Sequence, residues 1–65
     1  MTLLLNGQPQ TVSAKTLAEA LSELGYEDKI VATAVNGSFV PARLRAGVLL
    51  NEGDRIEIVA PMQGG

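Results

Sequence analysis

The sequence contains no cysteine, no histidine and no tryptophan, and its aromatic residues are one Phe and one Tyr. The lack of Cys excludes a disulfide framework and a thiolate nucleophile, and the joint lack of Cys and His removes the usual zinc ligands and the usual general base. With no imidazole to activate a Ser or Thr, an autonomous hydrolase is excluded as well. Few aromatics, a net charge of −2 and no run of like charge argue against nucleic acid or an anionic membrane surface as a partner.

Long hydrophobic runs are also missing. The amino-terminal run, residues 3–5, is too short for a secretion signal or a membrane span, so we expect a soluble cytoplasmic protein. The hydrophobic residues of the chain are mainly aliphatic: 46% of the 65 residues are apolar, and most of these are Leu, Ala, Val and Ile. A chain of this length forms one small domain with a thin core.

The first two elements form a predicted β-hairpin. Residues 3–5 lead into Asn6-Gly7, a strong signal for a tight turn, and residues 10–13 provide the returning strand. Alternation along the strand places Leu3 and Leu5 on one face together with Val12. Leu4 then lies on the opposite face, outside the predicted core, so the apolar character of its side chain is not explained by core packing.

A helix is predicted to follow the hairpin. Thr16 and Glu19 have the spacing of a capping box, in which each side chain satisfies the backbone N–H of the other residue. Gly25 supplies a left-handed stop. A single apolar stripe runs between these signals and consists of Leu17, Ala20, Leu21 and Leu24.

The second half of the chain contains two further strand patterns. Residues 30–35 are predicted as a central strand that ends at Asn36-Gly37, with a short return over 38–40 before Pro41. Residues 42–50 have poor periodicity, which favours a loop or one irregular turn. Residues 55–60 form a clear strand with Ile56 and Ile58 inward, and its outward side chains are Arg55, Glu57 and Val59.

This order of elements predicts an α+β domain over residues 1–60, with a mixed sheet of four to five strands and one main helix packed on one face. It is also the order of the β-grasp (ubiquitin-like) fold. Residues 61–65 have no periodicity and no charged side chain, so we expect them to form a flexible carboxyl-terminal tail.

The acidic residues do not form a predicted active site. Glu52 and Asp54 flank a turn glycine and Glu57 lies on the solvent side of a strand, where solvated charges are expected. Glu19 is explained by the capping box and Glu23 by solvation. We therefore expect no metal site and no catalytic residue.

The glycine pair Gly64-Gly65 has two possible meanings. A free chain end frays, but it also presents a carboxylate. The pair follows a strand without a long linker and adds neither a side chain nor a charge other than the carboxylate. Such a slender segment fits a narrow cleft in a partner.

Three segments of the chain form a combined pattern: Val35-Asn36-Gly37 with Val40-Pro41, residues 51–59, and Met62-Gln63-Gly64-Gly65. Together they resemble the ThiS family, the sulfur carrier proteins of thiamin biosynthesis, and the likeness spans essentially the whole chain. Members of that family are β-grasp domains of about this length, and their first strand ends in Asn-Gly, as it does at Asn6-Gly7.

The resemblance implies a carrier and not an enzyme. A ThiF-type adenylating enzyme would use ATP to activate the Gly65 carboxylate, a sulfur-donating protein would supply the sulfur, and the Gly65 thiocarboxylate would pass it to a thiazole synthase of the ThiG type. Gln63 and Gly64 would complete the reactive tail. The chain itself would bind no cofactor and would be a monomer when free. One departure from the family pattern occurs at residues 42–45, where relatives often carry Arg directly after Val-Pro.

Two alternatives remain at this point: the MoaD-type small subunit of molybdopterin synthase, which uses the same tail chemistry, and a β-grasp module that binds partners non-covalently. In each case a docking surface is needed. Strand alternation leaves Leu4 and Val59 outside the core, so we expect them, together with Met62, to contribute to an apolar docking surface.

Overall fold

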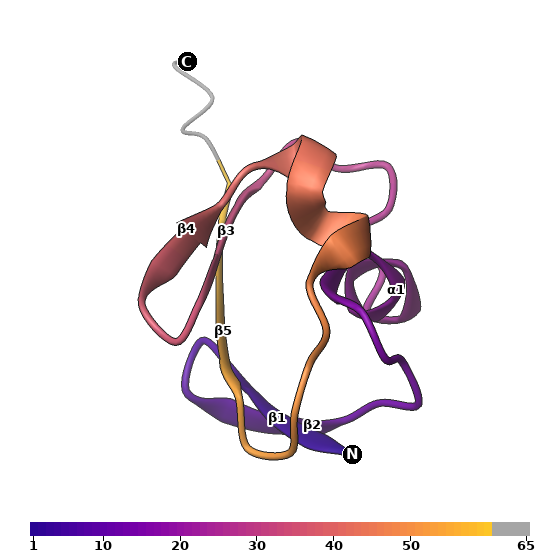
Figure 1. Ribbon diagram of the computed structural model, residues 1–65, viewed down its shortest axis with the longest axis vertical. Coiled ribbons are helices and arrows are strands. Elements are labelled where there is room, and N and C mark those ends of the chain that lie inside the picture. Colours follow the sequence, from indigo (N-terminus) through magenta and orange to yellow (C-terminus); the bar gives the residue numbers. More distant parts are fainter. Residues whose placement is uncertain (61–65) are drawn as a thin grey trace.

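The computed structural model describes residues 1–60, which form a five-stranded sheet with one α-helix and one short 3-10 helix. The strand order is β2-β1-β5-β3-β4; β1 and β5 are parallel, and the other neighbouring pairs are antiparallel. This arrangement confirms the predicted α+β class and mixed sheet (Figure 1). The elements are β1 (Thr2–Leu5), β2 (Gln8–Thr11), α1 (Leu17–Glu23), β3 (Ala32–Val35), β4 (Ser38–Val40), η1 (Ala42–Gly47) and β5 (Arg55–Val59).

The predicted hairpin is present, but its second strand begins earlier than expected. Asn6 and Gly7 both have positive φ, 48° and 84°, which fits the two-residue turns that match the twist of a hairpin. Because this loop has only two residues, Gln8 pairs directly with Leu5 and β2 ends at Thr11. Val12 therefore follows the strand instead of lying within it, although its side chain is buried as predicted.

The capping box at the start of α1 is confirmed. The hydroxyl of Thr16 accepts a hydrogen bond from the backbone N–H of Glu19 at 3.2 Å, and the Glu19 carboxylate accepts those of Lys15 and Thr16 at 3.0 and 3.1 Å. These backbone hydrogen bonds, that of Lys15 foremost, lower the pKa of Glu19 below its ordinary value of 4.5.

The helix stripe is also confirmed. Leu17, Ala20 and Leu21 are buried, and Leu24 packs against the same core while remaining partly exposed. Gly25 has a φ of +91° at the end of the helix, as the predicted stop requires.

Glu23 is exposed, as predicted, but it also makes a contact that the sequence did not indicate. Its two carboxylate oxygens accept hydrogen bonds from the backbone N–H of Ser13 at 3.0 and 3.1 Å, and one of them also accepts from the Ser13 hydroxyl. Glu23 thus connects the end of α1 to the segment that leaves the hairpin. The two residues are ten positions apart, so no short-range pattern shows this contact.

The strand predicted over residues 30–35 is shorter in the structure. It starts at Ala32, and Ile30 is 85% exposed. Ala32 pairs with Val59, the last residue of β5, so within the part of the chain that the structure describes the residues before Ala32 have no strand partner. The strand is interior as expected, but the middle position of the sheet belongs to β5.

Residues 42–50 contain a regular element that the sequence did not indicate. Ala42–Gly47 is a 3-10 helix, which packs against α1 (Figure 1). Arg45 joins this helix to β3 and to the residue before it, because its guanidinium donates hydrogen bonds to the Thr33 hydroxyl at 3.0 Å and to the Val31 carbonyl at 2.6 Å.

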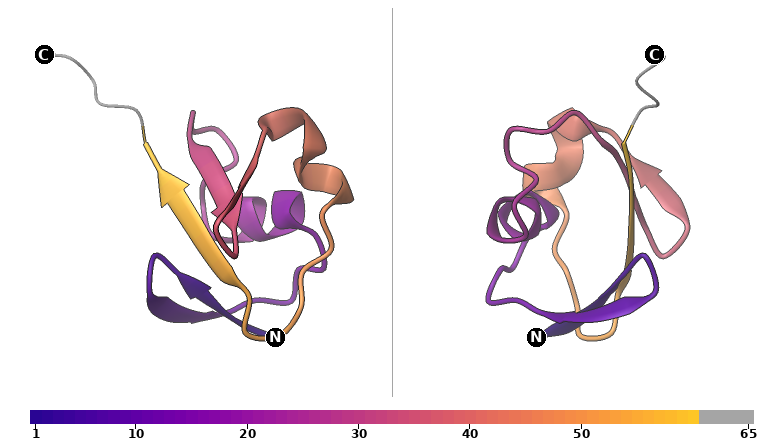
Figure 2. Two further views of the ribbon diagram at one scale, coloured as in Figure 1. Left: turned by 60° about the vertical axis from the view of Figure 1, so that its left-hand side comes forward. Right: turned by 180° about the vertical axis from the view of Figure 1, so that it is seen from behind.

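The core lies between the sheet and the two helices, so one face of the sheet is covered (Figure 2). Within residues 1–60 no helix is long and apolar enough to cross a membrane. The buried apolar side chains are Leu3, Val12, Ala14, Leu17, Ala20, Leu21, Val40, Leu50, Ile56 and Ile58.

Candidate tail and partner-docking face

The predicted reactive tail lies outside the residues that the structure describes. Met62, Gln63, Gly64 and Gly65 all fall within 61–65, and in the sequence only Ala60 separates these residues from β5. The geometry of the site is therefore that of β5 and of the sheet face around it.

β5 alternates as the sequence predicts. Ile56 and Ile58 are 1% and 7% exposed and face the helix, whereas the side chains between and beside them are exposed. Arg55, Glu57 and Val59 consequently lie on the opposite face of the sheet. We call this face the open face; the register adds Leu4 opposite Arg55, Ala34 opposite Glu57, Ala32 opposite Val59, and Phe39 opposite Ala34.

Of the three predicted docking residues, Leu4 and Val59 lie within the described part of the chain; both are on the open face, but they are not neighbours. Leu4 is partly buried, and Val59 is 62% exposed. Leu4 lies beside the first residue of β5 and Val59 is its last residue, so four residues of extended strand, about 13 Å, separate them. A docking surface that contains both must extend along the whole of β5.

Two exposed apolar residues near β5, Phe39 and Ile30, were not predicted from the sequence. Phe39 on the open face is 69% exposed. Its exposure could have been predicted, because neighbouring residues of a strand face opposite sides and Val40 is buried. Ile30 is 85% exposed and lines a hollow of about 270 Å³ with Val31, Ala32 and Val59. This hollow lies at the end of β5 from which the tail continues, and no local pattern indicated it.

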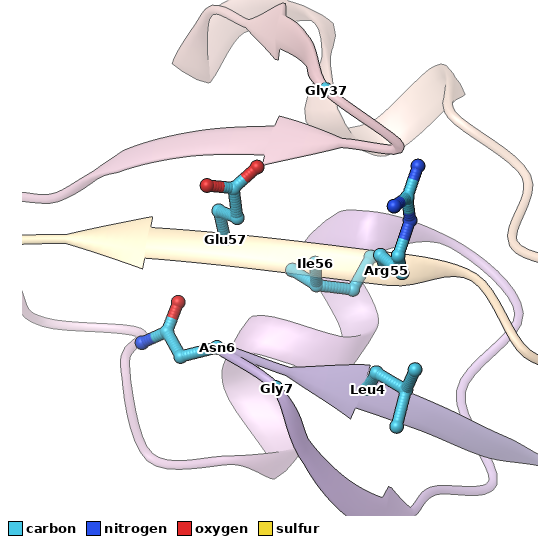
Figure 3. A pocket seen from close by; sticks show the side chains of 7 residues that line it. All are labelled: Leu4, Asn6, Gly7, Gly37, Arg55, Ile56 and Glu57. Carbon is cyan, nitrogen blue, oxygen red and sulfur yellow. The ribbon is translucent and has the colours of Figure 1, made fainter.

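A larger hollow lies at the other end of the open face. It has a volume of about 540 Å³ and is bounded by the two hairpin turns (Figure 3). The Arg55 and Glu57 side chains stand on the same side of β5 in this view, so the hollow carries one charge of each sign. Its lining residues are Leu4, Asn6, Gly7, Gly37, Arg55, Ile56 and Glu57.

Glu52 and Asp54, two of the three acidic residues in and around the last turn and strand, have structural roles. Glu52 accepts the backbone N–H of Thr2 at 3.0 Å. Asp54 accepts the backbone N–H of Asn51 at 2.8 Å and the side-chain amide of Asn36 at 3.0 Å. Among residues 1–60 no group of three acidic, His or Cys side chains could hold a metal ion.

The mixed five-stranded sheet with one main helix on one face defines a β-grasp domain. Solved structures agree with this class. The crystal structure of the thiamine biosynthesis protein ThiS from Geobacter metallireducens matches with a TM-score of 0.80 and 30% identity over 100% of both chains. An NMR solution structure of a thiamine biosynthesis protein from the same organism matches with a TM-score of 0.78 and 29% identity, over 100% of this chain and 88% of that one.

Sequence comparisons identify the family within this class. The ThiS family model matches residues 3–65, and the sulfur carrier protein ThiS of Thermus thermophilus is 46% identical over 94% of this chain and 95% of that protein. The chain belongs to the ThiS family and is a sulfur carrier of thiamin biosynthesis, not an enzyme.

A second relative is larger. A thiazole synthase of Paramagnetospirillum magneticum is 42% identical over 100% of this chain, which corresponds to only 20% of that protein. A segment similar to this chain is thus part of the same polypeptide as the thiazole synthase there.

Proposed function

We propose that this carrier transports sulfur as a thiocarboxylate on Gly65 and delivers it to a thiazole synthase. The observation that carries the proposal is the family match, which runs through residues 3–65 and so includes Gly64 and Gly65. The proposed cycle has an activation step, a sulfur-transfer step and a delivery step, each on a different partner. Because activation uses ATP, we place the cycle in the cytoplasm.

The chemistry of the tail explains why partners are needed. A carboxylate is a poor acyl donor until one oxygen leaves with a good leaving group. In the proposed activation the Gly65 carboxylate attacks the α-phosphorus of ATP on a ThiF-type enzyme, and pyrophosphate leaves. A sulfur-donating protein then provides sulfur at the oxidation level of sulfide, which attacks the acyl carbon and releases AMP. The side chains of the carrier include no His and no Cys, so they offer neither the usual base nor a thiol for these steps.

The thiazole synthase relative supports the proposed delivery partner. In that protein a segment similar to this chain is joined covalently to the synthase. Joining two binding modules raises their effective concentration to about the millimolar range when the linker is short. A separate carrier has no such advantage and needs a docking surface of its own.

We place that docking surface on the open face along β5. It combines the partly buried Leu4, the exposed Val59 and Phe39, and the apolar hollow beside Ile30. Apolar side chains gathered on one uncovered face are typical of a protein interaction site. Met62 extends the same apolar character beyond β5 in the sequence.

The proposed chemistry is tested on the intact carrier by mass spectrometry. After incubation with a ThiF-type enzyme, ATP and a sulfur donor, we expect a mass gain that corresponds to one oxygen replaced by sulfur, located by fragmentation at Gly65. Gly64→Val should abolish adenylation with nearly unchanged stability, because a Cβ widens the segment that must enter a narrow channel. Efficient thiocarboxylate formation after deletion of Gly65 would refute the proposal.

The docking surface is tested by Val59→Asp, alone and combined with Leu4→Asp. We expect a higher KM for the carrier in adenylation, because a charge on an apolar contact must be desolvated on binding. The matched control is Leu49→Asp, at a side chain 72% exposed in the segment that pairs with Thr16 at the helix side. Equal kinetics for Val59→Asp and Leu49→Asp would refute this placement.

The alternatives have distinct outcomes. A MoaD-type subunit would pass its sulfur to a molybdopterin precursor and leave the thiazole synthase without product. A non-covalent module would retain full function after removal of Gly64 and Gly65. Assays of the thiocarboxylated carrier with both acceptor systems, beside the truncated chain, separate these outcomes from the proposed one.

A further inference from the structure

We propose that Asn6 is a positioning residue, whose side chain holds the end of β5 in place so that the tail starts from a defined point. The proposal rests on the proposed function of that tail. In the sequence Asn6 is only part of a turn signal, and its side-chain contacts bridge a separation of 52 residues.

The need for such a residue follows from the parallel pairing of β1 and β5. The ladder between these strands ends where Leu5 pairs with Ile56, after which the backbone of Asn6 donates to the Ile56 carbonyl at 2.8 Å. The chain then turns away at Gly7 toward β2, while β5 continues to Val59. The N–H and C=O of Ile58 would therefore face a gap left by β1.

The Asn6 side chain fills this gap. Its Oδ1 accepts the backbone N–H of Ile58 at 2.9 Å, and its Nδ2 donates to the carbonyl of Ile58 at 3.1 Å. The amide thus takes the place of one more peptide group of β1, and only this orientation of the amide satisfies both bonds. Figure 3 shows the Asn6 side chain beside the carboxyl-terminal half of β5, near the arrowhead. Among residues 1–60, these are the last hydrogen bonds on the β1 side of β5.

The second hairpin provides an internal comparison. Asn36 also has positive φ, 50°, and is also followed by glycine. Its side chain accepts the backbone N–H of Arg55 at 2.9 Å and donates to Asp54. Because β3 is antiparallel to β5, its end and Asn36 lie at the start of β5; β1 is parallel and ends beside Ile56, so the Asn6 side chain that follows it reaches Ile58 farther along β5. Asn6 and Asn36 therefore hold opposite ends of the same strand.

Only the end held by Asn6 leads to the reactive carboxylate. Five residues, 61–65, can extend at most about 17 Å from Ala60. If the end of β5 shifts, the position from which these residues extend shifts with it, and so does the region that the Gly65 carboxylate can reach. Misplacement of a reacting group by about 1 Å can lower a rate by about 100-fold. We therefore expect Asn6 to affect the rate of tail activation and not the docking of the open face.

The test compares Asn6→Gly with Asn36→Gly in the full chain. Glycine keeps the positive φ of both turns, so each variant removes the side-chain amide without backbone strain. ATP–pyrophosphate exchange on a ThiF-type enzyme, below the unfolding range of both variants, gives kcat and KM for the carrier. We expect Asn6→Gly to lower kcat about tenfold or more with KM unchanged, and Asn36→Gly to have nearly wild-type kinetics.

Amide hydrogen exchange tests the contact without any partner. Asn6→Gly should deprotect the Ile58 amide and leave that of Arg55 protected, and Asn36→Gly should do the reverse. Equal losses of kcat in the two variants, or an unchanged kcat in Asn6→Gly, would overturn the positioning role while the carrier function stands. If the unaltered chain is not adenylated at all, the proposed function fails, and the positioning role falls with it.

Discussion

Replacement of Leu17 by Ala tests how much of the stability of this small domain comes from the contact between α1 and the sheet. Leu17 is 0% exposed and is the first residue of the helix. Ala and Leu are both strong helix formers, so the substitution does not penalise the helix itself. The loss of stability then reports the packing of one side chain and the cavity left behind.

The expected destabilisation by Leu17→Ala is large relative to the free energy of unfolding of the whole domain. Leu→Ala in a core costs about 2–5 kcal/mol, and complete enclosure of Leu17 places it toward the upper part of this range. Native domains have about 0.05–0.15 kcal/mol of stability per residue, which gives about 3–10 kcal/mol for 65 residues. With a urea m-value of about 1 kcal/mol/M, the unfolding midpoint should fall by about 2 M or more.

Urea unfolding followed by far-UV circular dichroism measures this loss, with two matched controls. Leu24→Ala, at a partly buried position of the same helix region, should cost less, and Leu44→Ala, at a side chain 51% exposed in η1, should cost least. The expected order is Leu17, Leu24, Leu44. A midpoint of Leu17→Ala within error of that of Leu44→Ala would refute the assignment of α1 to the core.

Two further predictions concern polar contacts. Glu19→Gln should destabilise the protein at neutral pH, and because folding lowers the pKa of Glu19, its contribution is complete above the ordinary value of 4.5 and fades as the pH falls below it. Thermal melts over that range check this, and a difference independent of pH would contradict it. Thr33→Val should cost about 1–3 kcal/mol, because the buried Thr33 hydroxyl donates to the Val40 carbonyl and accepts from Arg45. An unchanged urea midpoint would contradict that estimate.

Short-range chemistry made much of this fold predictable from the sequence. The capping box joins Thr16 and Glu19, three residues apart, and needs no tertiary context. The Asn-Gly pairs prescribe two-residue turns because Asn and Gly tolerate positive φ. Alternation along β5 correctly separated Ile56 and Ile58 from the exposed residues of the same strand.

The errors and omissions concern long-range partners. The exposure of Ile30 depends on where β5 ends. The 3-10 helix over residues 42–47 is held by hydrogen bonds of Arg45 to Thr33 in β3 and to Val31 just before β3, 12 and 14 positions away. The exposure of Glu23 was predicted correctly, but its hydrogen bonds with Ser13, ten positions away and outside α1, were not predicted.

In the candidate site, too, local features were predictable from the sequence and long-range contacts were not. The sequence by itself determined the family resemblance, the glycine tail and the outward direction of Leu4 and Val59, because these depend on residue identity and on the two-residue period of a strand. Only the tertiary structure decided that β5 lies in the middle of the sheet and that Asn6 pairs with Ile58. Strand order and contacts across 52 residues arise from the packing of the whole chain, and no local pattern of side chains encodes them.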